Sequence, residues 1–189
     1  MLSLYTSGTT GRPKGAVLTH DNSIWNALNM VIEARIEHED RGIVVPPFYH
    51  SASLNCWMLP HVIVGASLVV EQGFNPSELL RRLVQEKITN IFLVPAMYNF
   101  LLQVPDVQSY DFSAVRLAGT GASIMPIDVK KKVKGLFPNA GIIDVYGLSE
   151  AGPGVTILKA TDAFRKEGSV GKAMTTSLPL LLFRHNCPE

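Results

Sequence analysis

The chain has 189 residues, of which 47% are hydrophobic and 17% are charged, and its formal net charge is +1. These values fit a globular protein with one sizeable domain, and a charge so close to zero gives no reason to expect a nucleic acid partner. No signal peptide precedes the first motif and no apolar run reaches the ~18 residues of a membrane span, so we expect no transmembrane segment and a cytoplasmic location.

Short runs rich in Val, Ile and Leu alternate with helical patterns along the chain. Nearly continuous apolar runs are typical of strands that are buried on both faces. We predict six such strands, at residues 2–6, 42–46, 67–71, 90–94, 114–118 and 141–145. Helices are predicted at 20–35, at 75–86, from 95 through 101 and at 127–137. The second helix has Asn75 as its N-cap and Pro76 at its first position.

This alternation predicts an α/β fold, a mostly parallel sheet with flanking helices. Ligands of such sheets bind beyond the carboxyl ends of the strands. Residues 7–15 follow the first predicted strand and residues 146–150 follow the sixth, so two polar segments lie where a ligand is expected. The three lysines at 130–132 lie within the last predicted helix, and we expect them to form a solvated face.

The segment after the first strand combines glycines, hydroxyl side chains and two cations in the order Tyr5-Thr6-Ser7-Gly8-Thr9-Thr10-Gly11-Arg12-Pro13-Lys14-Gly15. Glycines let the backbone approach a ligand closely. Backbone N–H groups, hydroxyls and Lys14 can then converge on an anion, which favours a polyphosphate. The segment is not a Walker A loop, because Lys14 precedes the last glycine instead of following it. The alternative is a flexible polar surface loop.

This segment resembles the phosphate-binding signature of the adenylate-forming (AMP-binding) superfamily, which includes acyl- and aryl-CoA synthetases, luciferases and the adenylation domains of peptide synthetases. A second segment, Tyr146-Gly147-Leu148-Ser149-Glu150, resembles the next signature of that family. The resemblance implies an incomplete, internal part of the large N-terminal domain, with a partial ATP- and acyl-binding core at residues 1–173. Residues 174–189 do not look like the family, and we expect them to reflect a truncation, a change of reading frame or added sequence.

The resemblance implies activation of a carboxylic acid by ATP to an acyl-adenylate, followed by thioester formation with CoA as cosubstrate and release of AMP. It assigns ATP phosphates to the first signature, at Thr6, Ser7, Gly8, Thr9, Thr10, Gly11 and Lys14. It assigns Mg²⁺ to Glu150, whose hard oxygen ligands suit that ion. Lys14 and Glu150 are therefore the candidate catalytic residues. Taken alone, each is equally well explained as a solvated surface side chain.

The second signature and the strand before it are expected to hold the rest of the nucleotide. By resemblance, Ser149 contacts the α-phosphate, Tyr146 packs against adenine beside Gly147, and Asp144 accepts a hydrogen bond from the adenine amino group. Asp144 and Tyr146 are two residues apart, so they share one face of their strand. A core tyrosine and a strand-edge aspartate are the structural alternatives.

Two further segments are expected to line the acyl pocket. Gly121 and Ala122 lie in a segment that resembles a family turn whose small residues line the nucleotide and acyl sites, although an ordinary β–α turn would look similar. His50 ends a Pro-Pro-Phe-Tyr-His stretch that resembles one in CoA ligases, and we expect it to flank the acyl group. Ser53 stands where many relatives have glycine. The resemblance implies a fatty or aryl acid over an amino acid, because the adenylation domains of peptide synthetases tend to carry aspartate in this region.

Two alternatives to a CoA ligase remain open on sequence. One alternative is a truncated, non-catalytic fragment that keeps only nucleotide or phosphate binding. The other is an adenylation domain that serves a carrier protein. The aspartate that holds ribose, the hinge and the C-terminal lysine of the family are absent from the sequence. We therefore expect this chain alone to have negligible ligase activity. Its oligomeric state is unknown.

Overall fold

A seven-stranded sheet forms the centre of the protein in the computed structural model, which describes residues 2–6 and 11–177. The strand order is β4-β3-β5-β6-β7-β8-β9, and the first five of these strands run parallel. Their bounds are β3 Arg41–Val44, β4 Ser67–Val70, β5 Asn90–Phe92, β6 Leu117–Gly121 and β7 Gly141–Gly147. β8 (Gly154–Leu158) and β9 (Lys172–Ala173) complete the sheet in antiparallel pairing. The predicted α/β class is confirmed.

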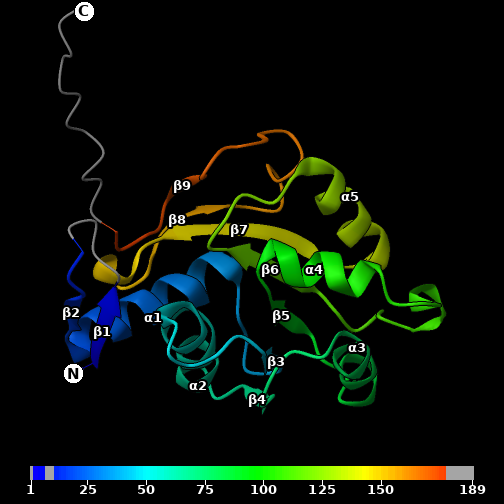
Figure 1. The fold of residues 1–189 in the computed structure, drawn as a ribbon, viewed down its shortest axis with the longest axis horizontal. Helices are drawn as coiled ribbons and strands as arrows, with labels where there is room; N and C mark the ends of the chain where they lie inside the picture. The colour runs from blue at the N-terminus through cyan, green and yellow to red at the C-terminus, as the bar shows by residue number, and fades with distance from the viewer. Residues whose placement is uncertain (1, 7–10, 178–189) are drawn as a thin grey trace, which may run out of the picture.

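Helices cover both faces of this sheet (Figure 1). One face carries α3 (Pro76–Gln85), α4 (Pro95–Leu102) and α5 (Ile127–Leu136). The other carries α1 (His20–Ala34), the π-helical segment Ala52–Met58 and α2 (Leu59–Ile63). Because side chains alternate across a strand, neighbouring residues enter different cores: Ile142 packs with the α3–α5 side and Ile143 with the α1 side. Two-sided burial explains the continuous apolar runs of the sequence.

The first predicted strand is a strand, but the prediction that it belongs to the buried sheet is wrong. β1 (Leu2–Thr6) pairs antiparallel with β2 (Lys14–Leu18) as a separate two-stranded hairpin, with Thr6 opposite Lys14. Only Leu4 of β1 is buried, and Tyr5 is 78% exposed. The sequence pattern missed β2, because the Lys-Gly start of that strand resembles a loop.

Other boundaries also differ from the prediction. β6 begins three residues later than expected and runs on through Gly119, Thr120 and Gly121. The two glycines have low intrinsic strand propensity, but the strand lies between β5 and β7. β4 lies at the edge of the sheet and is only half-buried. The antiparallel strands β8 and β9 and the π-helical segment were not predicted. At the chain's C-terminal side, Met174 is buried and Thr176 N–H donates to Asn29 Oδ1 of α1.

A buried polar network ties together the amino ends of the strands, opposite the predicted site. Arg116 pairs with Asp40, and Thr89 Oγ1 donates to Asp40 Oδ1 at 2.8 Å. His61 Nδ1 lies 2.7 Å from the Trp57 carbonyl oxygen, and its Nε2 lies 3.2 Å from Asn90 Nδ2. A neutral ring that donates from Nδ1 and accepts at Nε2 satisfies both contacts. Burial lowers the pKa of His61 below its ordinary value.

We expect the free energy of unfolding to decrease as the pH falls below about 6.5, the ordinary imidazole pKa. The unfolded chain takes up a proton there, whereas folded His61 stays neutral until the pH reaches its lowered pKa, so acid favours unfolding by at most about 1.4 kcal/mol per pH unit. Urea unfolding at pH 7.0 and 5.5 measures this. His61→Gln should flatten the dependence, while His20→Gln, at an exposed histidine, should not. Equal slopes in both variants would contradict the assignment.

Candidate functional site

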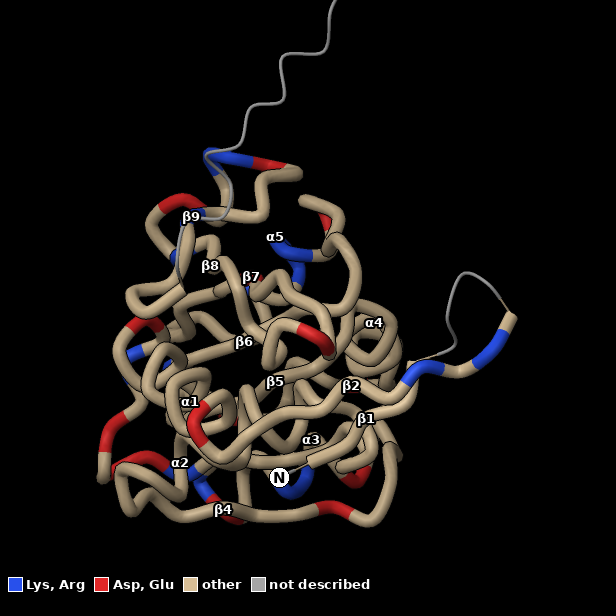
Figure 2. The backbone as a smooth tube through the Cα atoms, turned by 90° about the vertical axis from the view of Figure 1, so that its left-hand side faces the viewer, with Lys and Arg blue, Asp and Glu red and all other residues tan. Residues whose placement is uncertain are grey.

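The hairpin brings the two signature segments together. Thr6 Oγ1 of β1 lies 3.3 Å from Glu150 Oε1, although the two residues are 144 positions apart in sequence. Glu150 lies in a 3-10 turn at Ser149–Ala151. Lys14 is exposed and lies opposite Thr6 in the hairpin, and Gly11 has a φ of +83°. Figure 2 shows basic segments where the hairpin projects from the body of the protein. The predicted phosphate ligands Ser7, Gly8, Thr9 and Thr10 lie outside the described residues.

The carboxyl ends of β6 and β7 approach each other very closely. A Cβ atom at Gly121 would lie 2.7 Å from the Val145 carbonyl oxygen and 3.1 Å from Phe92 Cζ, so only glycine fits there. The next residue, Ala122, has a φ of +66°, in the left-handed region that costs a non-glycine residue energy and is often found at functional sites. Two pockets open on either side of these strand ends.

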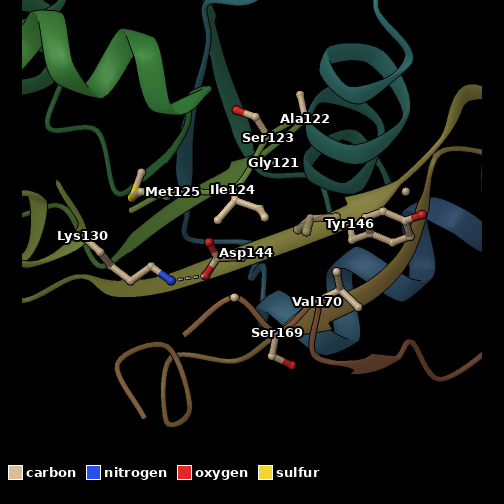
Figure 3. A pocket seen from close by; sticks show the side chains of 13 residues that line it. Gly121, Ala122, Ser123, Ile124, Met125, Lys130, Asp144, Tyr146, Ser169 and Val170 are labelled. Carbon is tan, nitrogen blue, oxygen red and sulfur yellow. Dashed lines mark hydrogen bonds and ion pairs between the residues drawn. The ribbon is translucent and has the colours of Figure 1, made fainter. Parts of the chain in front are cut away.

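The first pocket, here the α5-side pocket, has a volume of about 290 Å³. It is lined by Gly121, Ala122, Ser123, Ile124, Met125, Lys130, Asp144, Val145, Tyr146, Gly147, Gly168, Ser169 and Val170. Asp144 and Tyr146 both line it, as their spacing predicts, and Tyr146 is 49% exposed (Figure 3). The pocket therefore offers an aromatic ring and a carboxylate on one strand.

Lys130 corrects the expectation of a solvated lysine face on α5. Lys131 and Lys132 are exposed, but Lys130 is only 3% exposed. Its Nζ donates to Asp144 Oδ2 at 2.8 Å and to the Ala163 carbonyl oxygen at 3.1 Å. A run of like residues in a helix cannot all face water, because successive side chains are rotated by about 100° around the axis. The prediction treated the three lysines as one face, so it missed Lys130 as a pocket residue.

The second pocket, here the π-helix-side pocket, has a volume of about 350 Å³ and shares Gly121, Ala122, Val145 and Gly147 with the first. Its remaining lining comes from the 46–56 stretch, from β5 and from the segment after β7, at Pro46, His50, Ser51, Ala52, Ser53, Cys56, Phe92, Val94, Leu148, Ser149, Pro153 and Gly154. His50 is exposed, with its ring 4.6 Å from that of Tyr49. Sequence reasoning named His50 and Gly121 but missed the apolar wall at Phe92 and Val145.

Polar side chains connect this second pocket to the signature segments. Ser51 Oγ and Ser149 Oγ lie 3.4 Å apart, and Ser149 precedes Glu150. Cys56 is fully buried, and burial raises the pKa of its thiol to about 12, so it is a wall residue and not a nucleophile at neutral pH. The second pocket thus combines an apolar interior with hydroxyl groups where it meets the 3-10 turn.

The donor set around Glu150 fits a magnesium ion that arrives with phosphates. Glu150 is exposed, and the Thr6 hydroxyl lies 3.3 Å from its Oε1. Across residues 2–6 and 11–177, no cluster of three or more His, Cys, Asp or Glu side chains could hold a metal by itself. Mg²⁺ typically binds proteins through one or two carboxylates plus substrate phosphates and water, so one carboxylate beside hydroxyls suffices. In the same part of the chain, no helix is both long and apolar enough to cross a membrane.

The chain matches a family model described as AMP-binding enzyme over residues 1–181. It is 36% identical over 170 residues to a feruloyl-CoA synthase of Amycolatopsis, which is 90% of this chain and 34% of that protein. It is 35% identical over 167 residues to 4-coumarate–CoA ligase 2 of Nicotiana tabacum, covering 86% of this chain and 30% of that one. The chain thus spans about a third of the length of these curated relatives.

Solved structures agree with these sequence matches. The inhibitor-bound N-terminal domain of FACL13 from Mycobacterium tuberculosis superposes with a TM-score of 0.85 at 32% identity, covering 92% of this chain and 43% of that chain. O-succinylbenzoate coenzyme A synthetase from Bacillus subtilis, in complex with ATP and a magnesium ion, gives 0.79 at 26% identity over 92% and 35% of the two chains. The expected likeness to part of an N-terminal domain is confirmed.

We expect Gly121→Ala to destabilise the protein by about 1–3 kcal/mol, because the added methyl group meets the Val145 carbonyl and the Phe92 ring. Gly135→Ala is the matched control, since a Cβ there meets nothing within 4 Å and helical alanine is favoured over glycine. Urea unfolding of both variants tests the close approach of β6 and β7. Similar stability changes in the two variants would contradict it.

Proposed function

Because the chain belongs to the AMP-binding enzyme family, we propose that it supplies the nucleotide- and acyl-binding part of a carboxylate–CoA ligase. The observation that supports this most directly is the pair of pockets that meet at Gly121, Ala122 and Gly147. An acyl-adenylate has a nucleotide on one side of its mixed anhydride and an acyl group on the other. Two pockets that join at one strand end match that shape.

In this proposal the α5-side pocket holds the adenine. Tyr146 offers its ring to the base, and Asp144 accepts a hydrogen bond from the exocyclic amino group. The phosphates extend toward the hairpin, where Ser149 contacts the α-phosphate and Thr6 and Lys14 contact the β- and γ-phosphates. Lys14 contributes a mobile point charge, which suits a phosphate ligand. The signature residues 7–10 are proposed to add hydroxyl and N–H donors there.

Glu150 is proposed to hold Mg²⁺. When bound, the ion would supply positive charge that neutralises the phosphates and favours departure of pyrophosphate. The residues of this chain orient the reactants: a carboxylate oxygen of the acid attacks the α-phosphorus, and the bond from that phosphorus to the bridging oxygen breaks. In the second half-reaction the thiol of CoA attacks the acyl carbonyl, the thiol proton is lost and AMP leaves.

The π-helix-side pocket is proposed to take the acyl group. Phe92, Val94 and Val145 give it an apolar wall, and His50 flanks its opening. An apolar wall accepts the hydrocarbon of a fatty or aryl acid by burial of its surface. The chain spans only part of its relatives, and we propose that this part alone binds nucleotide without appreciable ligation.

Lys14→Ala should weaken MgATP binding roughly ten- to hundredfold, the range for loss of a charged hydrogen bond of about 1.5–3 kcal/mol. The affinity for AMP should be unchanged, because Lys14 is proposed to contact only the β- and γ-phosphates. Isothermal titration calorimetry of the 189-residue chain measures both. Lys131→Ala, at an exposed lysine of α5, is the control for loss of one positive charge. If the wild-type chain folds but shows no saturable MgATP binding, the proposed function is wrong for this chain.

Glu150→Gln should reduce ATP affinity several-fold when Mg²⁺ is present and leave it unchanged in EDTA, because the amide cannot replace the charge of the carboxylate toward the ion. Calorimetric titrations with and without Mg²⁺ give this comparison. Glu167→Gln, at an exposed carboxylate outside both pockets, is the matched control. Equal losses with and without Mg²⁺ would assign Glu150 a role other than metal binding.

A further inference from the structure

The ion pair between Lys130 and Asp144 is the one buried lysine contact on the wall of the α5-side pocket among the described residues. It joins α5 to β7, and the second bond of Lys130, to the Ala163 carbonyl oxygen, ties both to the segment after β8. Burying an ammonium group is costly unless it is paired and hydrogen-bonded. The proposed function uses Asp144 but gives Lys130 no role.

The contact leaves the two oxygens of Asp144 in different situations. Oδ2 accepts from Lys130, while Oδ1 has no hydrogen-bond partner in the part of the chain that the structure describes. The Asp144 side chain is 19% exposed, so it is accessible from the pocket. In Figure 3 Lys130 reaches Asp144 from the α5 side, and Tyr146 lies further along the same strand. One oxygen is therefore held, and the other is available to a ligand.

We propose that Lys130 is a positioning residue that fixes the side chain at position 144, so that the pocket presents a hydrogen-bond acceptor to the exocyclic amino group of a purine. A lysine ammonium has three donors and no acceptor, so whatever group faces it must be an acceptor. The inference rests on the proposed function, because it takes the base to lie in the α5-side pocket. It extends that function by assigning amino-group selectivity to the pair and not to Asp144 alone.

The variant Asp144→Asn separates an oriented side chain from a free one. With Lys130 present, the amide oxygen must turn toward the ammonium group, which leaves the NH₂ group facing the base. Two donors then oppose each other when the base carries an amino group. With Lys130 removed, the amide can rotate and offer its oxygen to the base again. Selectivity should therefore be lost in the single variant and return in the double variant Lys130→Met/Asp144→Asn.

The probes are MgATP and the Mg²⁺ complex of purine riboside triphosphate, which has hydrogen in place of the 6-amino group. Calorimetry should show that the wild-type chain prefers ATP roughly tenfold, about the value of one net hydrogen bond. Asp144→Asn should abolish or reverse this preference, and Lys130→Met/Asp144→Asn should restore a several-fold preference. The matched control is Lys131→Met/Asp144→Asn, which removes an exposed lysine instead and should behave as Asp144→Asn does.

Three results would overturn the inference while leaving nucleotide binding intact. They are an unchanged ATP preference in Asp144→Asn, no recovery in a folded Lys130→Met/Asp144→Asn, and equal binding of both probes by the wild type. Circular dichroism establishes folding, and if the double variant does not fold, the near-isosteric Asp144→Asn variant still decides the question. Failure of the wild-type chain to bind either probe would contradict the proposed function itself.

Discussion

The close approach of β6 and β7 at their carboxyl ends is the constraint on which the site depends. Gly121 has no room for a side chain against the Val145 carbonyl, and it lines both pockets together with Ala122, Val145 and Gly147. A larger residue there would push the strands apart or close the junction. Parallel strands end at one edge of a sheet, so the segments that follow β6 and β7 gather there. The two pockets meet at that edge.

The hairpin β1–β2 adds the polar part of the site to this edge. The hairpin is a separate two-stranded sheet and not part of the large one. It contacts the rest of the site through Thr6, whose hydroxyl lies 3.3 Å from Glu150. A small, exposed element of this kind can carry flexible donors without disturbing the cores on either side of the sheet. Phe92 and Val145 of the apolar pocket wall come from the central strands β5 and β7, whereas the residues proposed to contact phosphate come from a hairpin and a 3-10 turn.

The two ends of the sheet use charge in different ways. At the amino ends, Asp40 pairs with Arg116, and both ring nitrogens of His61 have a polar partner, at the Trp57 carbonyl and at Asn90. At the carboxyl ends, Lys130 satisfies one oxygen of Asp144 and leaves the other facing a pocket. That oxygen is accessible from the pocket, so water or a ligand can complete its hydrogen bonding. In our proposal it is the acceptor that contacts the base.

The sequence by itself determined the fold class and the identity of the two signature segments. Continuous apolar runs indicate two-sided burial, and each signature is a short run of adjacent residues, so both are local signals. Tertiary structure alone decided three features: that β1 pairs with β2 outside the sheet, that β6 runs on through Gly119 and Gly121, and that Lys130 is buried. Each depends on a partner in another element, such as Asp144 of β7 for Lys130 of α5, and the type of a residue does not identify that partner.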